Sequence, residues 1–362
     1  MRSAALTGGL VFPTFGSREA AMKNKWLAIG VLILLGVLMA SASPTHRALA
    51  QPGDVAELKV TIREWSVPTK GAHPHDPAVG PDGALWFTEQ MSNKLGRLDP
   101  KTGKFKEYPL VSGKNSGPHG LVADQFGNIW YTANFGGYIG KLDPNTGKVT
   151  EYQMPNKKAD DPHTAVFDAF GMLWFTVQGG NMVGKLDPNT GRVILKEVPT
   201  EAALPYGIQV TNRGVPVFCE LGTHKIGTIN TVSLEIKEYD LPESARPRRL
   251  AVAADDTVYF TDFKGGNLGK LNLATGDVQM YPSPGGPESN PYGIAITPDG
   301  MVWYSESGVL PNTIIRFDPK TGKFARANIP SGGGVVRNMA ATQDGRVYIA
   351  CSGVDKVGIV EP

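Results

Sequence analysis

Short apolar runs alternate with turns rich in Gly, Pro, Asn and Asp through most of the chain, from residue 60 to the C-terminus. One unit covers residues 118–155, where the runs GLVAD, IWYTA, YIGKLDP and KVTEYQMP are separated by turns such as FGN and NTG. Each run has the length of a β-strand, and none shows the 3.6-residue period of a helix. The unit therefore predicts a four-stranded antiparallel sheet.

This unit recurs seven times, with successive copies 42 to 45 residues apart. Each copy opens with a large polar residue beside or near a proline, which we call the anchor residue, and an aromatic or apolar residue follows eleven positions later. Repeats of this period and strand content are typical of propeller blades. We therefore predict an all-β fold, a seven-bladed β-propeller forming a single domain over residues 51–362. The anchor residues and their partners are His75 and Trp86, His119 and Trp130, His163 and Trp174, Tyr206 and Val217, Arg248 and Tyr259, Tyr292 and Trp303, and Arg337 and Tyr348.

The two ends of the repeat region complement each other. The seventh copy stops at KVGIVEP, after its third strand, whereas VTIREWSVP at Val60 to Pro68 stands alone before the first copy. This segment matches the fourth strand of the other copies, since its Glu64-Trp65 corresponds to Glu-Tyr pairs elsewhere. We expect the N-terminal strand to complete the last blade, which would leave no open gap in the ring.

Residues 1–50 carry a different pattern. A short basic stretch from Met22, the apolar run LAIGVLILLGVLMA and the small residues Ala48-Leu49-Ala50 resemble a Sec signal peptide cut before Gln51. The apolar run is shorter than the roughly 20 residues that span a bilayer, so a permanent anchor is the weaker alternative. Met22 is also a plausible true start. We expect a periplasmic or secreted protein with no membrane span in the mature chain.

The charge balance and the number of cysteines limit which partners and cross-links the chain can be expected to have. Removing residues 1–50 takes five of the 36 basic residues and one of the 34 acidic residues, which leaves 31 against 33. No basic stripe remains, so nucleic acid is not an expected partner. We expect a monomer with a small-molecule ligand. Cys219 and Cys351 lie three repeats apart, and we predict no disulfide between them.

Two sets of polar side chains are expected at one mouth of the central channel. The anchor residues precede the inner strands, and the residues fourteen positions later end the second strands of the same hairpins. Imidazoles beside carboxylates can bind a divalent metal or transfer protons, although a wet channel mouth also accounts for a polar ring without function. Asp76, next to His75, fits either a site acid or an ordinary turn. The second set is Glu89, Ala133, Val177, Glu220, Asp262, Glu306 and Cys351.

The repeated motif PHGL, IWYT, IGKLDP, TGK and EY resembles the streptogramin B lyase (virginiamycin B lyase) family over residues 60–362. The resemblance implies a seven-bladed propeller with Mg²⁺ and a histidine base at the channel mouth. It also implies opening of a cyclic depsipeptide by elimination, in which the metal polarises the ester carbonyl and the base removes the neighbouring α-proton.

The family pattern has histidines on neighbouring blades, an acid two residues before one of them and a glutamate fourteen after it. Here the histidines are His75, His119 and His163, which we take as catalytic candidates. Asp161 lies two residues before His163 and Glu89 lies fourteen after His75, so these two are the candidate metal ligands. The acids are split between blades.

Three functions remain open on this basis. The first is a metal-assisted carbon–oxygen lyase that opens a cyclic ester. The second is a ligand-binding or scaffold propeller without catalysis, for which Arg248, Arg249 and Arg337 would grip an anionic group. The third is a gluconolactonase-like hydrolase, although the ring has few asparagines to serve as metal ligands. The expected substrate-binding residues are Tyr206, Arg248, Tyr292, Arg337, Glu220, Asp262 and Glu306.

Overall fold

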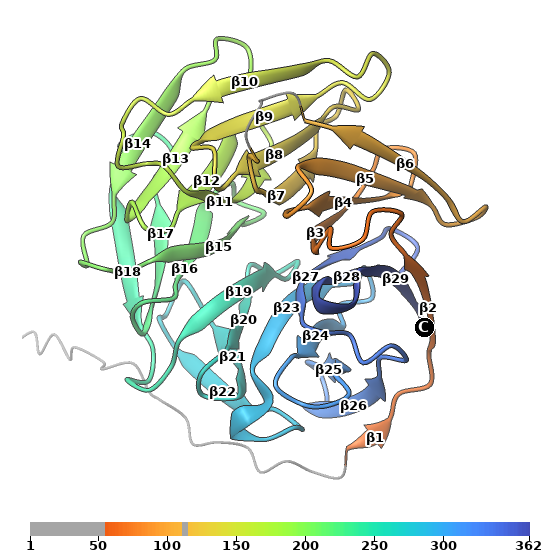
Figure 1. Ribbon diagram of the computed structural model, residues 1–362. Coiled ribbons are helices and arrows are strands. Elements are labelled where there is room, and N and C mark those ends of the chain that lie inside the picture. The colour runs from red at the N-terminus through yellow and green to blue at the C-terminus, as the bar shows by residue number, and fades with distance from the viewer. Residues whose placement is uncertain (1–54, 111–114) are drawn as a thin grey trace, which may run out of the picture. The chain divides into compact units, whose positions relative to one another are not determined.

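The computed structural model describes residues 55–110 and 115–362. Within this part the chain forms seven sheets arranged as blades around a centre, which confirms the predicted seven-bladed propeller (Figure 1). The signal peptide predicted in residues 1–50 lies outside the described residues. No helix in the described part is long and apolar enough to cross a membrane.

Each blade contributes one inner strand that faces the centre of the ring (Figure 1). Six of the inner strands begin at a proline, whose fixed φ and missing N–H suit the first residue of a strand. Each inner strand is hydrogen-bonded to one partner strand only, the second strand of its own blade. The inner strands are β3 (Pro74–Val79), β7 (Pro118–Ala123), β11 (Pro162–Phe167), β15 (Pro205–Val210), β19 (Pro247–Val252), β23 (Pro291–Ile296) and β27 (Val336–Ala341).

The second and third strands of each blade form its buried middle. The second strands are fully buried along their length: β4 (Leu85–Glu89), β8 (Ile129–Ala133), β12 (Leu173–Val177), β16 (Pro216–Glu220), β20 (Val258–Asp262), β24 (Val302–Glu306) and β28 (Val347–Cys351). The third strands are β5 (Lys94–Asp99), β9 (Tyr138–Leu142), β13 (Met182–Leu186), β17 (Lys225–Ile229), β21 (Asn267–Leu271), β25 (Thr313–Asp318) and β29 (Lys356–Glu361).

Most outer strands consist of exposed and partly buried residues, as expected of a rim exposed to water, whereas β22 has no exposed residue. They are β6 (Lys104–Pro109), β10 (Val149–Gln153), β14 (Val193–Glu197), β18 (Ile236–Asp240), β22 (Val278–Pro282), β26 (Lys323–Asn328) and, in the last blade, β2 (Thr61–Ser66). A short strand, β1 (Ala56–Glu57), adds to β26 in parallel. Two 3₁₀ turns, η1 (Pro287–Ser289) and η2 (Ser352–Val354), complete the described elements.

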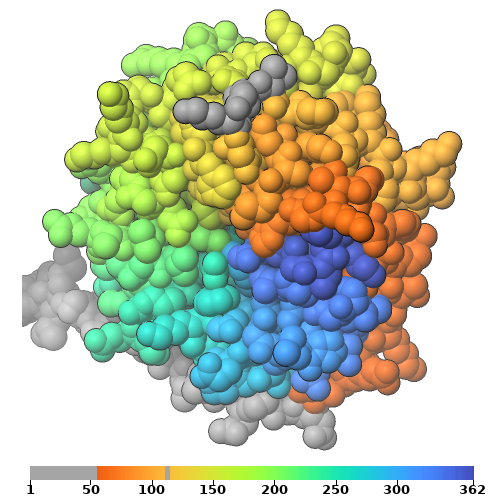
Figure 2. All heavy atoms as spheres, viewed as in Figure 1, coloured from red at the N-terminus to blue at the C-terminus, as the bar shows by residue number. Residues whose placement is uncertain are grey.

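The N-terminal strand closes the ring as predicted. β2 pairs antiparallel with β29 over its whole length, from Thr61 opposite Glu361 to Ser66 opposite Lys356. Arg63 and Glu361 add an ion pair at 2.8 Å across this pairing. The first and last blades consequently lie side by side, with orange and blue atoms in contact (Figure 2).

The hydrophobic core lies between neighbouring blades. Trp130 of the second blade, for example, packs with Leu173 and Phe175 of the third. Its indole N–H donates to Asp124 Oδ2 at 2.8 Å, so the turn that precedes the second strand also orients the ring. A glycine on the third strand makes room for the aromatic ring of the second: a Cβ at Gly184 would lie 2.1 Å from the Phe175 ring. Both cysteines are buried and unpaired, which confirms that no disulfide joins them.

Candidate functional site

A repeated hydroxyl group positions the anchor residues at the channel. In the first blade, Thr88 Oγ1 accepts a hydrogen bond from the Asp76 N–H at 3.0 Å and donates to the carbonyl of His119 at 3.0 Å. Thr132 makes the same pair of contacts, with Gly120 N–H and His163 carbonyl, both at 2.7 Å. The contacts coincide with a bulge between Pro74 and Pro77 and its counterparts. Thr176 and Thr261 donate in the same way to the carbonyls of Tyr206 and Tyr292, so four blades fix the backbone of the next blade's anchor.

Four anchor side chains form a continuous stack. The ring centroids of His75 and His119 are 3.8 Å apart, those of His119 and His163 3.9 Å, and those of His163 and Tyr206 3.8 Å. The hydroxyl of Tyr206 is hydrogen-bonded to that of Tyr292 across the ring. All three histidines are 2–3% exposed. The structure therefore brings the three predicted catalytic candidates together as one buried cluster.

Two arginines complete the ring of anchors and remain half-buried. The Arg248 guanidinium lies 3.9 Å from the centroid of Tyr292 and 4.2 Å from that of Phe263, a cation–π arrangement. Arg337 donates from Nε to Ser352 Oγ at 3.2 Å. These guanidinium groups are the part of the mouth that water and a ligand can reach.

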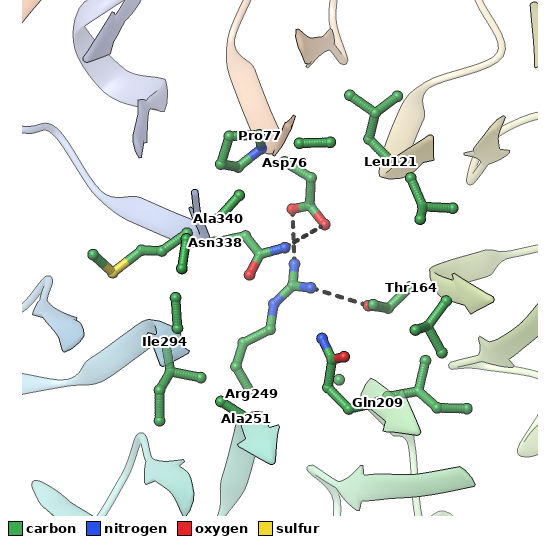
Figure 3. Close-up of a pocket in the computed structure, with 18 of the residues that line it drawn as sticks. Asp76, Pro77, Leu121, Thr164, Gln209, Arg249, Ala251, Ile294, Asn338 and Ala340 are labelled. Atoms are coloured by element: carbon green, nitrogen blue, oxygen red, sulfur yellow. Dashed lines mark hydrogen bonds and ion pairs between the residues drawn. The ribbon is translucent and has the colours of Figure 1, made fainter. Parts of the chain in front are cut away.

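The residue after each anchor forms a second layer, shown in Figure 3. Arg249 donates from Nη2 to Asp76 Oδ1 at 2.8 Å and from Nη1 to Thr164 Oγ1 at 3.1 Å, while Asn338 Nδ2 donates to Asp76 Oδ2 at 3.0 Å. Four blades are tied together in this way. We call these four residues the cross-channel network.

The sequence signal for the cross-channel network is an alternation of polar residues and glycines at the position after the anchor, from one blade to the next. The residues after the anchors of the other three blades are Gly120, Gly207 and Gly293. A Cβ at Gly120 would lie 2.5 Å from the carbonyl oxygen of His163, and one at Gly207 would lie 2.9 Å from Arg249 Cα. Large polar residues therefore alternate with glycines whose backbones approach the next inner strand closely.

The network also determines the state of His75. Its Nδ1 lies 2.8 Å from Asp76 Oδ1. Burial, followed by the nearby Arg249 and Arg337, holds the pKa of His75 well below its ordinary value of 6.5. Burial likewise lowers the pKa of His119 and His163 well below that value. A neutral His75 must donate its Nδ1 proton to the carboxylate, so its Nε2 carries the free lone pair.

The predicted metal ligands are held by groups other than the imidazoles. Glu89 Oε2 accepts from Ser92 Oγ at 2.7 Å, and Asp161 accepts from the backbone N–H of Gly179 at 2.6 Å and of Gly180 at 3.3 Å. Burial raises the pKa of Glu89 to about 7. The structure does not bring Glu89 or Asp161 into the histidine cluster.

The other carboxylates of the second set also bind loops instead of facing the channel. Glu220 accepts from Thr223, Asp262 from the Arg246 and Gly265 N–H groups, and Glu306 from Ser283, Gly285 and Thr313. The reason is the alternation of side chains along a strand. Before Asp262 and Glu306, the hydroxyl residues Thr261 and Ser305 face the next inner strand, so these carboxylates point to the opposite side. The carboxylates that were expected to form a second ring at the mouth therefore hold loops in place instead.

The donor set does not fit Mg²⁺. Among the described residues, His75, Asp76 and His119 form the group whose ligand atoms lie within 4.8 Å of one another. Mg²⁺ prefers an octahedral shell of oxygen ligands, whereas two of these three ligands are imidazole nitrogens. The single carboxylate is already paired with the guanidinium of Arg249. Arg249 thus supplies the positive charge at this carboxylate.

Comparison with known proteins places these features in a family. The model of the virginiamycin B lyase family matches residues 48–274 and 218–362. A virginiamycin B lyase of Nocardia farcinica is 32% identical over 166 residues, which are 44% of this chain and 52% of that protein. One of Streptomyces coelicolor is 40% identical over 50 residues, 14% of this chain and 17% of that protein. The chain thus matches about half, or less, of the length of these relatives.

Solved structures agree on the fold. A streptogramin B lyase structure has a TM-score of 0.76 at 24% identity and covers 83% of this chain and 97% of its own. A catalytically inactive virginiamycin B lyase variant from Staphylococcus aureus, solved with quinupristin, has a TM-score of 0.76 at 23% identity, over 84% of this chain and 100% of its own. Hydrazine synthase of Kuenenia stuttgartiensis also matches, with a TM-score of 0.69 at 17% identity, over 82% and 97%. Propellers of this shape therefore serve different reactions.

Proposed function

Because the chain belongs to the virginiamycin B lyase family, we propose that it is a carbon–oxygen lyase that opens a cyclic ester at the channel mouth. The observation that carries the proposal is the His75–Asp76 pair, a neutral imidazole oriented by a buried carboxylate. Such an imidazole is unprotonated at neutral pH, as a general base must be before it takes a proton. His75 is followed by a carboxylate that orients its ring, whereas His119 and His163 are followed by Gly120 and Thr164. The geometry therefore supports His75 as the base.

The proposed step is an elimination. His75 Nε2 takes the proton from the carbon next to the ester-bearing carbon. The electron pair of that C–H bond forms a C=C bond, and the bond between the alkoxy carbon and the ester oxygen breaks. The ester leaves as a carboxylate, so no water is consumed and all atoms remain in one ring-opened product.

Arg248 and Arg337 have the chemistry to stabilise the leaving group. Negative charge develops on the two carboxylate oxygens as the carbon–oxygen bond breaks, and guanidinium groups pair well with that geometry. Positioned charges aimed at developing charge are an effective source of catalysis. This role of the arginines accounts for a cationic mouth without a metal.

We further propose that the protein acts outside the cytoplasm, after cleavage before Gln51. The support is the basic, apolar and small-residue order of residues 22–50. The intact mass of the protein recovered from the periplasm or medium would test this. A chain that begins at Gln51 supports export, and a full-length chain retained in the cytoplasm contradicts it.

The activity is tested with quinupristin as substrate, in buffer containing EDTA. Elimination leaves the mass of the product equal to that of the substrate, whereas hydrolysis would add one water. We expect a ring-opened product of unchanged mass, lost in His75→Gln and retained in the control His224→Gln, which changes a histidine in the loop between β16 and β17 that is not part of the stack. No product, or equal rates in the two variants, would refute the assignment.

A non-catalytic binding role is the second candidate. The observation that favours it is the 2–3% exposure of the three stacked histidines, which leaves Arg248 and Arg337 as the reachable groups. In this case a carboxylate or ester ligand would raise the unfolding temperature without forming a product. Loss of that protection in Arg337→Ala, with no turnover in any variant, would favour binding over catalysis.

A further inference from the structure

The channel continues beyond the cross-channel network, on the side away from the histidines. A cavity of about 400 Å³ is lined by residues of all seven inner strands, from the network to the strands' C-terminal ends. Asp76, Thr164, Arg249 and Asn338 lie at its floor (Figure 3). The network thus separates this compartment, which we call the far compartment, from the mouth.

The floor of the far compartment holds unused hydrogen-bond donors. A guanidinium group has five N–H donors, and among the described residues Arg249 uses one for Asp76 and one for Thr164. Its Nε is buried and has no partner within the described part of the chain. Arg249 as a whole residue is 2% exposed. An unpaired buried donor of this kind is costly unless an acceptor is supplied.

The charge around the floor is positive. Arg248 and Arg337 lie in the adjacent layer and Arg249 in the floor, whereas Asp76 is the one carboxylate that the cross-channel network contains. Gln209 is exposed and points toward this floor in Figure 3, so the compartment can be reached by solvent. These charges favour an anionic acceptor.

The walls suit a short hydrocarbon tail. Side chains such as Ala78, Val122, Ala251 and Ile294 line the cavity, and they present small aliphatic groups. The volume is within the range of small-ligand pockets. Because these aliphatic side chains stand above a floor that holds the guanidinium group of Arg249, the matching ligand has one acid group at one end and a short chain at the other.

We propose that the far compartment is a second ligand site, which binds a small monocarboxylate with a short aliphatic tail. The carboxylate accepts hydrogen bonds from the free donors of Arg249, and the tail lies among the aliphatic side chains. The site is independent of the proposed lyase activity, because the cross-channel network lies between the two.

Butyrate is the probe, measured by calorimetric titration of the mature protein. Gln209→Glu places a negative charge beside Arg249, and we expect it to weaken butyrate binding at least tenfold, whereas Gln209→Lys strengthens it. Gln153→Glu adds the same charge on the outer strand β10 and is the matched control, with unchanged binding expected. Since Gln209 and Gln153 are both exposed, the variants should fold, which thermal unfolding verifies.

Two further measurements separate this site from the mouth. We expect Arg337→Ala, which removes a charge of the adjacent layer, to weaken butyrate binding less than Gln209→Glu does, and Gln209→Glu to leave quinupristin turnover intact. Absence of saturable binding, equal affinity in Gln209→Glu and the unmodified chain, or loss of binding in Arg337→Ala would overturn the proposal. Failure of the lyase assay alone would leave it standing.

Discussion

The Asp76–Arg249 pair offers a sharp test of how the channel is held together. Asp76→Asn preserves the shape of the side chain, removes its charge and turns one acceptor into an NH₂ group. Asp76 and Arg249 are 1% and 2% exposed, and the carboxylate accepts from Arg249 at 2.8 Å and from Asn338 at 3.0 Å. The variant leaves a buried guanidinium without a counter-charge and sets two amide donors against each other.

The expected loss follows from this burial. Breaking a buried ion pair from one side costs about 3–5 kcal/mol, because the remaining charge stays desolvated. The unfolding entropy is about 2.1 cal/mol/K per residue, or roughly 0.65 kcal/mol/K over the described length, so the unfolding temperature should fall by about 5–8 °C. Arg249→Met in addition should restore part of the loss, since the unpaired charge is then absent.

Urea unfolding of the two single variants and the double variant, combined in a double-mutant cycle, measures the coupling directly. Matching slopes with urea across the variants would show that they unfold to the same extent. A loss below about 1 kcal/mol for Asp76→Asn would refute the reasoning, because that is the range of exposed pairs. Additive losses in the double variant would do the same.

Three other outcomes are expected. Burial raises the pKa of Glu220 from 4.5 to about 7, so the stability that its protonated form provides is lost as the pH rises through 7. Glu220→Gln should therefore make the unfolding temperature depend less on pH, and the variant should unfold at a higher temperature than the unmodified chain above pH 7. Thermal unfolding measured at a series of pH values on both sides of 7 would record this. Cys219 and Cys351 should react with a thiol reagent only after denaturation, and a denatured, unreduced protein with fewer than two reactive thiols would contradict their free state. Gly184→Ala should lower the free energy of unfolding by about 1–3 kcal/mol, because its Cβ meets the Phe175 ring. The same substitution should be less destabilising in a Phe175→Leu background. Strictly additive losses of stability, measured by urea unfolding, would exclude the ring as the cause.

The repeat was enough to predict the blades and their closure, because both depend on local strand and turn chemistry. The period of the anchors located every inner strand, and the lone segment VTIREWSVP identified the partner of β29. The three histidines also lie next to one another, because they occupy equivalent positions in successive blades. These features repeat, so the sequence shows the residue at each equivalent position several times.

The chemistry between blades was harder to predict. Asp76 and Arg249 lie 173 residues apart, and neither residue type repeats at its position. Glu89 and the other second-strand carboxylates bind loops instead of facing the channel because of the bulge in the inner strand and the alternation of side chains, neither of which is visible in the spacing of the repeat. A contact that occurs once, across the ring, leaves no period to detect.

Ring closure has a consequence for when the protein can fold. Arg63 and Glu361, which pair across β2 and β29, are separated by 298 positions, so the last blade is incomplete until synthesis reaches the end of the chain. Bringing such distant segments together is slow compared with forming a hairpin. A growing chain therefore carries β2 without its partner strand β29, and its ring stays open. Pairing of β2 with β29, once both segments are free to meet, would be the event that completes the ring.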